Sequence, residues 1–145
     1  MFYGQFEHTI DRKGRLTVPA KFRQTLKQQD VKTLYLTLGL DGCLFLFPEP
    51  EWRVIEGRFK QISFMKSEGR KFHRLFFSNA TEVAIDTLGR IAVSKTLKRL
   101  VDIEWDVIVV GVSTRMEIWA KKKWYADSDE MHAKYEELAE RVIVE

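Results

Sequence analysis

The stretch Asp11-Arg12-Lys13-Gly14-Arg15-Leu16-Thr17-Val18-Pro19 returns 75 residues later as Asp86-Thr87-Leu88-Gly89-Arg90-Ile91-Ala92-Val93-Ser94. The shared frame is Asp-x-x-Gly-Arg-apolar-x-Val, in which a glycine turn precedes an arginine and a short apolar segment. Self-similarity at a fixed spacing indicates that one structural unit is repeated. A duplicated turn that carries an arginine therefore indicates a duplicated binding surface rather than a single catalytic pocket.

The likeness between the two copies continues on both sides of this motif. The further matches are Glu7 with Glu82, Ile10 with Ile85, Leu36–Gly39 with Ile108–Gly111, and Trp52 with Trp124. A chance match would rarely keep an acidic turn, two apolar strands and a closing tryptophan in the same order. We therefore interpret the chain as two tandem repeats.

A chain of 145 residues can form one domain or two small ones. We place the first repeat at residues 1–65, a charged connector at 66–74, and the second repeat, with a C-terminal helix, at 75–145. Since no low-complexity linker separates them, we expect the two halves to pack together.

The sequence pattern of each repeat predicts the same order of elements: strand, turn, strand, short helix, hairpin and longer helix. Gly14 supplies the positive φ of a tight turn, and Asp11 can bond its own backbone two residues on. The predicted strands are 5–10, 15–18, 33–39 and 43–47, with 106–112 and 115–119 as the second hairpin. Helices are expected to begin near Pro19 and its counterpart Ser94, near Pro48–Glu51, and near Asp127 or Ser128. The fold class is therefore α+β with a mainly antiparallel sheet.

Composition indicates a globular protein, with 45% hydrophobic and 12% aromatic residues. No apolar run approaches the roughly 18 residues of a membrane span, and residues 1–8 lack the pattern of a signal peptide. The single cysteine, Cys43, lies in an apolar strand pattern and is expected to be a buried, inert thiol. We therefore expect a cytosolic protein that is not bound to a membrane.

Charge is distributed unevenly, although the net charge is only +3. Residues 11–27 carry six basic side chains and one acidic one, and residues 53–74 carry seven basic and two acidic ones. Residues 126–145 carry only two basic side chains and seven acidic ones. This segregation indicates a basic working face and an acidic C-terminal segment. Ordinary solvated surface is the alternative.

Signals for catalysis are weak. The three histidines are far apart in sequence and none has the spacing of a metal site. Asp11 and Asp86 could form a carboxylate pair, but each is better explained as the cap of its own turn. The aromatic stripes Phe45, Phe47, Trp52, Trp119 and Trp124 favour core packing over base stacking. We therefore expect no enzyme, no catalytic residue, no metal and no cofactor.

Arginine is the better candidate for function. Arg15 and Arg90 follow the turn glycines, and a guanidinium there can pair bidentately with guanine or with a phosphate. The alternative is an intramolecular pair in which Asp11 or Asp86 holds its own arginine, and the residue types do not decide between the two. The first turn adds Arg12 and Lys13, whereas the second offers Thr87 and Leu88. On charge, the first turn is the stronger binder.

With these residues laid out, the chain resembles the MraZ family, which is related to the SpoVT–AbrB DNA-binding families. The likeness covers nearly the whole chain, and the first Asp-x-x-Gly-Arg motif together with its second copy is highly specific. The residues that carry it are Met1-Phe2-x-Gly4, His8, Asp11–Arg23, Phe76-Phe77-x-x-Ala80-x-Glu82, Asp86-x-x-Gly89-Arg90, Glu117-Ile118-Trp119 and Trp124.

The resemblance implies a double-split β-barrel-like domain made of two AbrB-like halves. It also implies a bacterial transcriptional regulator that assembles into rings and binds short tandem DNA repeats ahead of a division and cell-wall gene cluster, in the cytoplasm at the nucleoid. The implied DNA contacts are Arg12, Lys13, Arg15, Thr87 and Arg90, on turns stabilised by Asp11, Gly14, Asp86 and Gly89.

Two departures from the family pattern make a DNA-contacting role less certain for the second turn than for the first. Leu88 stands where a polar residue is common, and Ser94 replaces the usual proline. An alternative function is a protein-binding, antitoxin-like module, in which the acidic segment after Asp127 meets a basic partner.

Overall fold

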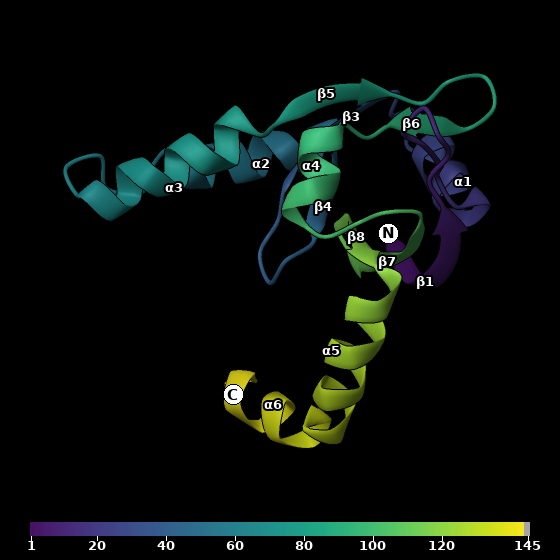
Figure 1. Ribbon diagram of the computed structural model, residues 1–145. Coiled ribbons are helices and arrows are strands. Elements are labelled where there is room, and N and C mark those ends of the chain that lie inside the picture. The colour runs from purple at the N-terminus through teal and green to yellow at the C-terminus, as the bar shows by residue number, and fades with distance from the viewer. Residues whose placement is uncertain (144–145) are drawn as a thin grey trace.

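The computed structural model describes residues 1–143, and its strands lie in two sheets (Figure 1). The elements in chain order are β1 (Phe2–Thr9), β2 (Arg15–Thr17), α1 (Ala20–Gln28), β3 (Thr33–Leu38), β4 (Leu44–Pro48), α2 (Glu49–Phe59), α3 (Ser67–Ser78), β5 (Thr81–Ala84), β6 (Arg90–Ala92), α4 (Lys95–Leu100), β7 (Asp106–Ser113), β8 (Arg115–Ala120), α5 (Lys121–Ala133) and α6 (Tyr135–Val142). The predicted antiparallel α+β class and both predicted hairpins are confirmed.

The two repeats exchange their first strands. The six-stranded sheet has the order β1-β7-β8-β4-β3-β5, so β1 of the first repeat pairs with β7 of the second. In the same way, β5 of the second repeat pairs with β3 of the first. The two-stranded sheet joins β2 to β6 and therefore also contains one strand from each half. The halves interlock rather than lie side by side.

The pairing register shows that the repeats are related by an approximate twofold axis. In the β4–β8 pair Phe45 lies opposite Glu117, which is its counterpart at the offset of 72. In the β2–β6 pair Leu16 lies opposite Ile91, its counterpart at the offset of 75. Because Phe45 and Leu16 each lie opposite their own counterparts, the axis passes through both strand pairs. The sequence repeat therefore corresponds to an approximate twofold symmetry of the structure.

Strand alternation divides the core into two clusters. Successive side chains of β3 and β4 point to opposite faces, so Leu34 and Leu46 join one cluster while Phe45 and Phe47 join the other. The first cluster includes residues of β2, β6, α1 and α4, and the second includes residues of α2, α3 and α5. All five aromatic residues predicted for the core are buried.

Cys43 is also buried, as predicted. Burial raises the pKa of its thiol, so the thiol stays protonated at neutral pH and is a poor nucleophile.

The two short helices begin by the different chemistry that the sequence predicts. The Ser94 hydroxyl accepts a hydrogen bond from the Leu97 N–H at 3.2 Å, which caps α4. Pro19 precedes α1 without a side-chain cap.

The start predicted for the C-terminal helix near Asp127 or Ser128 is wrong, because α5 already begins at Lys121. Trp124 lies in the second core cluster and donates to Gln5 Oε1 at 2.8 Å, and this tertiary packing draws the segment into helix without a side-chain cap. Ser128 lies within α5 rather than at its start, and its hydroxyl oxygen is 3.1 Å from Nδ1 of His132.

The connector predicted at residues 66–74 forms most of α3, which continues to Ser78. The domain limits 1–65, 66–74 and 75–145 stay a prediction.

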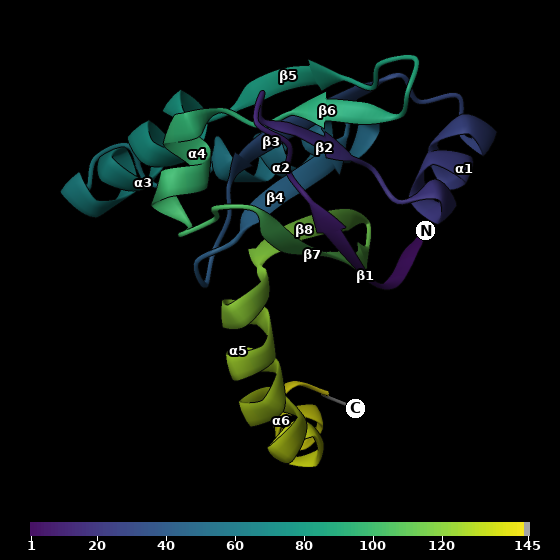
Figure 2. The ribbon, with the colours of Figure 1, turned by 45° about the vertical axis from the view of Figure 1, so that its right-hand side comes forward.

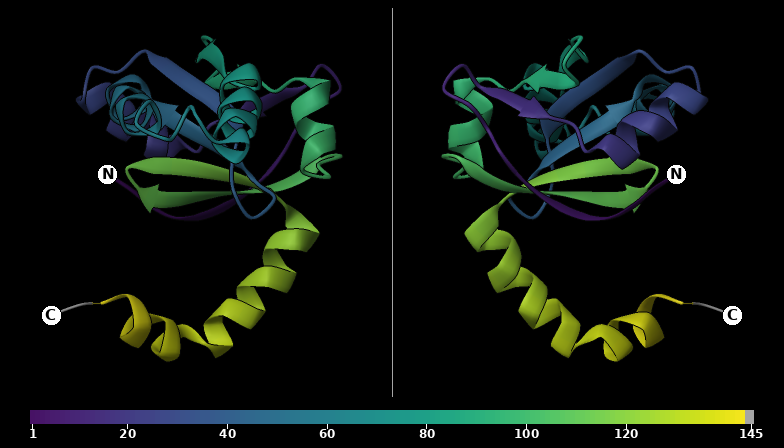
Figure 3. Two further views of the ribbon diagram at one scale, coloured as in Figure 1. Left: turned by 90° about the vertical axis from the view of Figure 1, so that its left-hand side faces the viewer. Right: turned by 90° about the vertical axis from the view of Figure 1, so that its right-hand side faces the viewer.

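The closure expected of a barrel-like domain is not confirmed, since within residues 1–143 the larger sheet is open, with β1 and β5 at its edges. Helices α5 and α6 extend away from the sheets (Figure 3). No helix in residues 1–143 is long and apolar enough to cross a membrane.

Candidate nucleic-acid interface

The first turn is built around the Asp11 carboxylate. Its Oδ1 accepts hydrogen bonds from the Lys13 and Arg15 backbone N–H groups, each at 2.9 Å. These bonds, that of Arg15 above all, and the nearby Arg15 and Arg90 charges hold the pKa of Asp11 below its usual value. The carboxylate is therefore ionised at neutral pH and accepts hydrogen bonds from its own turn. It leaves Arg12 and Lys13 exposed at the tip.

The second turn repeats this geometry. Asp86 Oδ1 accepts from the Leu88 and Arg90 backbone N–H groups, each at 2.9 Å. Gly14 and Gly89 occupy equivalent positions with φ of 78° and 81°, a region that favours glycine. Both turns therefore have the same backbone geometry, and the turn-stabilising roles of Asp11, Gly14, Asp86 and Gly89 stay a prediction.

The two arginines differ in their partners. Arg90 Nε donates to Asp86 Oδ2 at 2.9 Å, so the intramolecular pair that the sequence left open is formed in the second turn. Arg15 forms no ion pair with any residue in the range 1–143. The first arginine is therefore free to bind a ligand, whereas the second must leave a carboxylate to do so.

Each turn is anchored to the opposite repeat. The Val93 N–H donates to the Gly14 carbonyl at 2.7 Å, and the Val18 N–H donates to the Gly89 carbonyl at 2.9 Å. A Cβ on Gly14 would lie only 2.7 Å from the Val93 carbonyl oxygen, so the backbone approach itself requires glycine. The turns are thus rigidly placed at the two ends of the β2–β6 ribbon (Figure 2).

The ribbon brings Arg15 and Arg90 onto one face. Arg15 lies opposite Ala92 and Thr17 lies opposite Arg90, and directly opposed residues share a face. Leu16 and Ile91 point the other way and are buried at 1% exposure. The outer face is therefore a short strip with two arginines. The turn that carries Arg12 and Lys13 lies at one end of this strip, and the turn that carries Thr87 lies at the other.

A hollow of about 550 Å³ lies beside the first turn. Besides Arg12 and Lys13, it is lined by Lys95 and Lys98 of α4 and by Glu82. Sequence reasoning missed these two lysines as site residues. No local signal identifies them, because they meet the first turn only through the pairing of β2 with β6.

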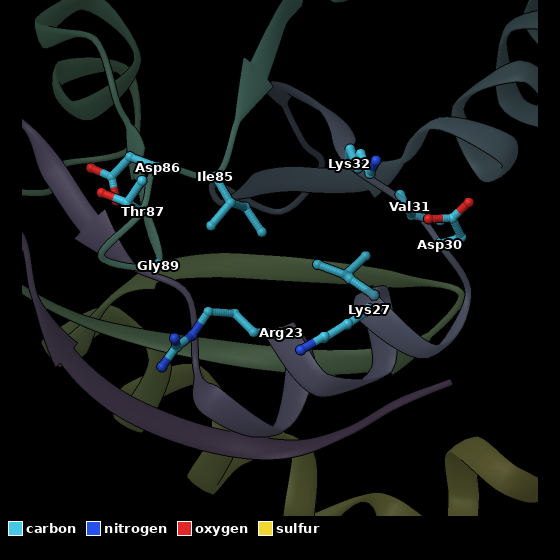
Figure 4. Close-up of a pocket in the computed structure, with 10 residues that line it drawn as sticks. Arg23, Lys27, Asp30, Val31, Lys32, Ile85, Asp86, Thr87 and Gly89 are labelled. Carbon is cyan, nitrogen blue, oxygen red and sulfur yellow. The ribbon is translucent and has the colours of Figure 1, made fainter.

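A smaller hollow of about 290 Å³ lies beside the second turn. Asp86 and Thr87 stand on one side of it, and Arg23 and Lys27 of α1 stand on the other (Figure 4). Acidic and basic side chains both line this hollow.

On the sequence-based hypothesis that Arg90 contacts DNA, Asp86→Asn is expected to strengthen DNA binding about two- to fivefold, in keeping with the modest strength of an exposed ion pair. Asparagine keeps the oxygen that accepts from the turn, but it removes the charge that holds Arg90. Fluorescence anisotropy on labelled DNA measures the change. Asp129→Asn on α5 is the matched control, because it alters net charge equally but lies far from the ribbon. Equal affinities for both variants would show that Arg90 makes no contact with DNA.

Comparison with known proteins agrees with the repeat. A family model described as "MraZ protein, putative antitoxin-like" matches the chain twice, at residues 1–75 and 76–144. The chain belongs to the MraZ family. The two-repeat organisation predicted from the sequence is thereby confirmed.

Several relatives of this chain carry the name "Transcriptional regulator MraZ". One from Desulforamulus reducens is 43% identical over 99% of this chain and 98% of its own length. Another, from Thermoanaerobacter sp., is 45% identical over 98% of this chain and 96% of its own length. One from Ligilactobacillus salivarius is 43% identical over 99% of this chain and 97% of its own length. The MraZ family is one of transcriptional regulators rather than enzymes, in agreement with the sequence-based expectation.

Proposed function

We propose that this protein is a sequence-specific DNA-binding transcriptional regulator that reads DNA with the outer face of the β2–β6 ribbon. The observation that carries the proposal is the pair of half-buried arginines on the outer face of a two-stranded ribbon whose other face is buried. The major groove of B-DNA is wide enough for a two-stranded β-ribbon. The names of the relatives support the same function.

The first turn is the principal contact in this proposal. Arg15 is free to pair bidentately with the O6 and N7 atoms of a guanine, while Arg12 and Lys13 at the tip reach phosphates. Arg90 and Thr87 make the secondary contact. Asp11, Gly14, Asp86 and Gly89 hold the turns that present these side chains.

Several copies acting together would make binding depend on repeated sites. We propose a ring-shaped homo-oligomer that binds tandem repeats in the promoter of its own division and cell-wall gene cluster, at the nucleoid in the bacterial cytoplasm. Each copy supplies few contacts, but tethering raises the effective concentration of every later one. Avidity gained in this way can exceed one-site affinity by roughly 10²–10⁴.

Arg15→Ala is expected to weaken binding to cognate DNA roughly 5- to 150-fold, the value of one bidentate arginine–guanine pair. The measurement is anisotropy on the upstream DNA of the protein's own gene, with one repeat or several in tandem, against scrambled DNA. Arg58→Ala is the control, because Arg58 is exposed on α2, a helix that packs in the second core cluster and not in the one that contains the ribbon. Equal loss in both variants, or equal affinity of wild type for cognate and scrambled DNA, would contradict sequence reading by the ribbon.

A protein-binding, antitoxin-like module is the second candidate. Helix α6 favours it, because none of its residues is buried and its Glu136, Glu137 and Glu140 are exposed beside Tyr135 and Leu138. In this case Arg15→Ala would leave complex formation with a basic partner intact. Loss of both DNA binding and complex formation in that variant would rule out a separate protein-binding surface.

A further inference from the structure

The two ends of the β2–β6 ribbon differ in charge although the repeat makes them equivalent. The first-turn end carries four cationic side chains, Arg12, Lys13, Lys95 and Lys98. Their counterparts at the offset of 75 are Thr87, Leu88, Ala20 and Arg23. The repeats have therefore kept the same backbone while three of the four charges are present at one end alone.

The four cations at the first-turn end converge from both repeats. Lys95 and Lys98 are three residues apart on α4, which places them on one side of that helix. Lys95 is exposed and Lys98 is half-buried, so both ammonium groups can reach solvent. None of the four forms an ion pair with a residue in the range 1–143. Glu82 is the single acidic side chain among those that line the hollow, which leaves a net charge of +3.

The second-turn end offers no comparable site. Arg23 Nε donates to the Val18 carbonyl at 2.9 Å, which fixes its guanidinium against the backbone. Asp30 and Asp86 line the same hollow as Lys27 and Lys32, so their charges offset one another. At the tip, Leu88 is 66% exposed and cannot pair with an anion.

We infer that Lys95 and Lys98, together with Arg12 and Lys13, form a binding site for the DNA backbone phosphates beside the first turn. The inference rests on the proposed function, since it places the phosphates at the end of the ribbon that enters the groove. Lysine ammonium groups on flexible stems suit phosphate oxygens, whose positions vary along a duplex. Phosphate contacts fix register and orientation without reading sequence. The charged end therefore orients a nearly symmetric ribbon on the duplex.

The test is the double variant Lys95→Gln and Lys98→Gln in the full chain, with folding checked by circular dichroism. The slope of log K against log[salt] is expected to become shallower by about 1.8, because each lost phosphate contact removes about 0.9. Affinities for cognate and scrambled DNA should fall by the same factor. The matched control is Lys27→Gln and Lys32→Gln, which removes the same charge at the second-turn end and should leave the slope unchanged.

An unchanged slope in the Lys95 and Lys98 variant would overturn the inference, and so would an equal change in the two double variants. Such a result alongside loss of sequence preference in Arg15→Ala would reject the phosphate site but leave the ribbon contact standing. Failure of the wild type to prefer cognate DNA would instead reject the proposed function, and the phosphate site with it.

Discussion

A fragment of residues 1–75 is expected to be unfolded as a monomer, although it contains the whole first repeat. Among the strand pairs of residues 1–143, this fragment keeps only the β3–β4 hairpin. Its β1, β2 and β4 lose β7, β6 and β8, and β3 loses β5. An isolated two-stranded hairpin is marginally stable at best. The apolar face of the first core cluster would also be left open to water.

Circular dichroism and size-exclusion chromatography measure this outcome. The fragment alone should lack a cooperative thermal transition, and an equimolar fragment of residues 76–145 should restore one by supplying the missing strands. A monomeric first fragment that unfolds cooperatively would show that the repeats are independent, contrary to the exchanged strands.

Trp52→Ala is expected to lower the free energy of unfolding by about 3–5 kcal/mol, as large-to-small aromatic substitutions in well-packed cores do. Trp52 is 3% exposed and lies between two rings. It stacks on Tyr35 of β3 with centroids 5.0 Å apart and on Phe76 of α3 at 5.6 Å. Alanine would leave a cavity where α2, α3 and the large sheet meet.

Urea unfolding followed by far-UV circular dichroism measures the loss. Trp105→Ala is the matched control, because the same change is made at a side chain that is 51% exposed. The control should stay within about 0.5 kcal/mol of wild type. Similar losses in the two variants would mean that the aromatic stack contributes nothing beyond an exposed ring.

Features set by neighbouring residues could be predicted from the sequence. The Asp-x-x-Gly turns, the hairpin strands and the Ser94 cap each depend on chemistry within a few positions, and the structure contains all three. The start of α5 was missed because Trp124 packs in the core, a tertiary effect that outweighs the Asp127 and Ser128 signal.

The candidate site was predictable only in part. Arg15 and Arg90 lie in the same local sequence, yet only Arg90 is paired with its own aspartate among the residues described. Which arginine is free depends on side-chain conformation, and the motif alone does not determine it. Lys95 and Lys98 reach the first turn across more than 80 positions of sequence, through a strand pairing that periodicity cannot reveal. The DNA-contacting residues themselves stay a prediction until binding is measured.

The exchange of first strands has a consequence during protein synthesis. About 100 residues separate β1 from its partner β7, so at roughly 5–20 residues per second the ribosome needs about 5–20 seconds to supply that partner. Until then β1 and the free edge of β4, whose partner β8 follows β7 in the chain, are exposed, and such unpaired edges favour aggregation. Long-range pairing also slows folding, because loop closure must precede the contacts that reward it. The nascent chain therefore passes through an interval in which its first half is complete in sequence and incomplete in structure.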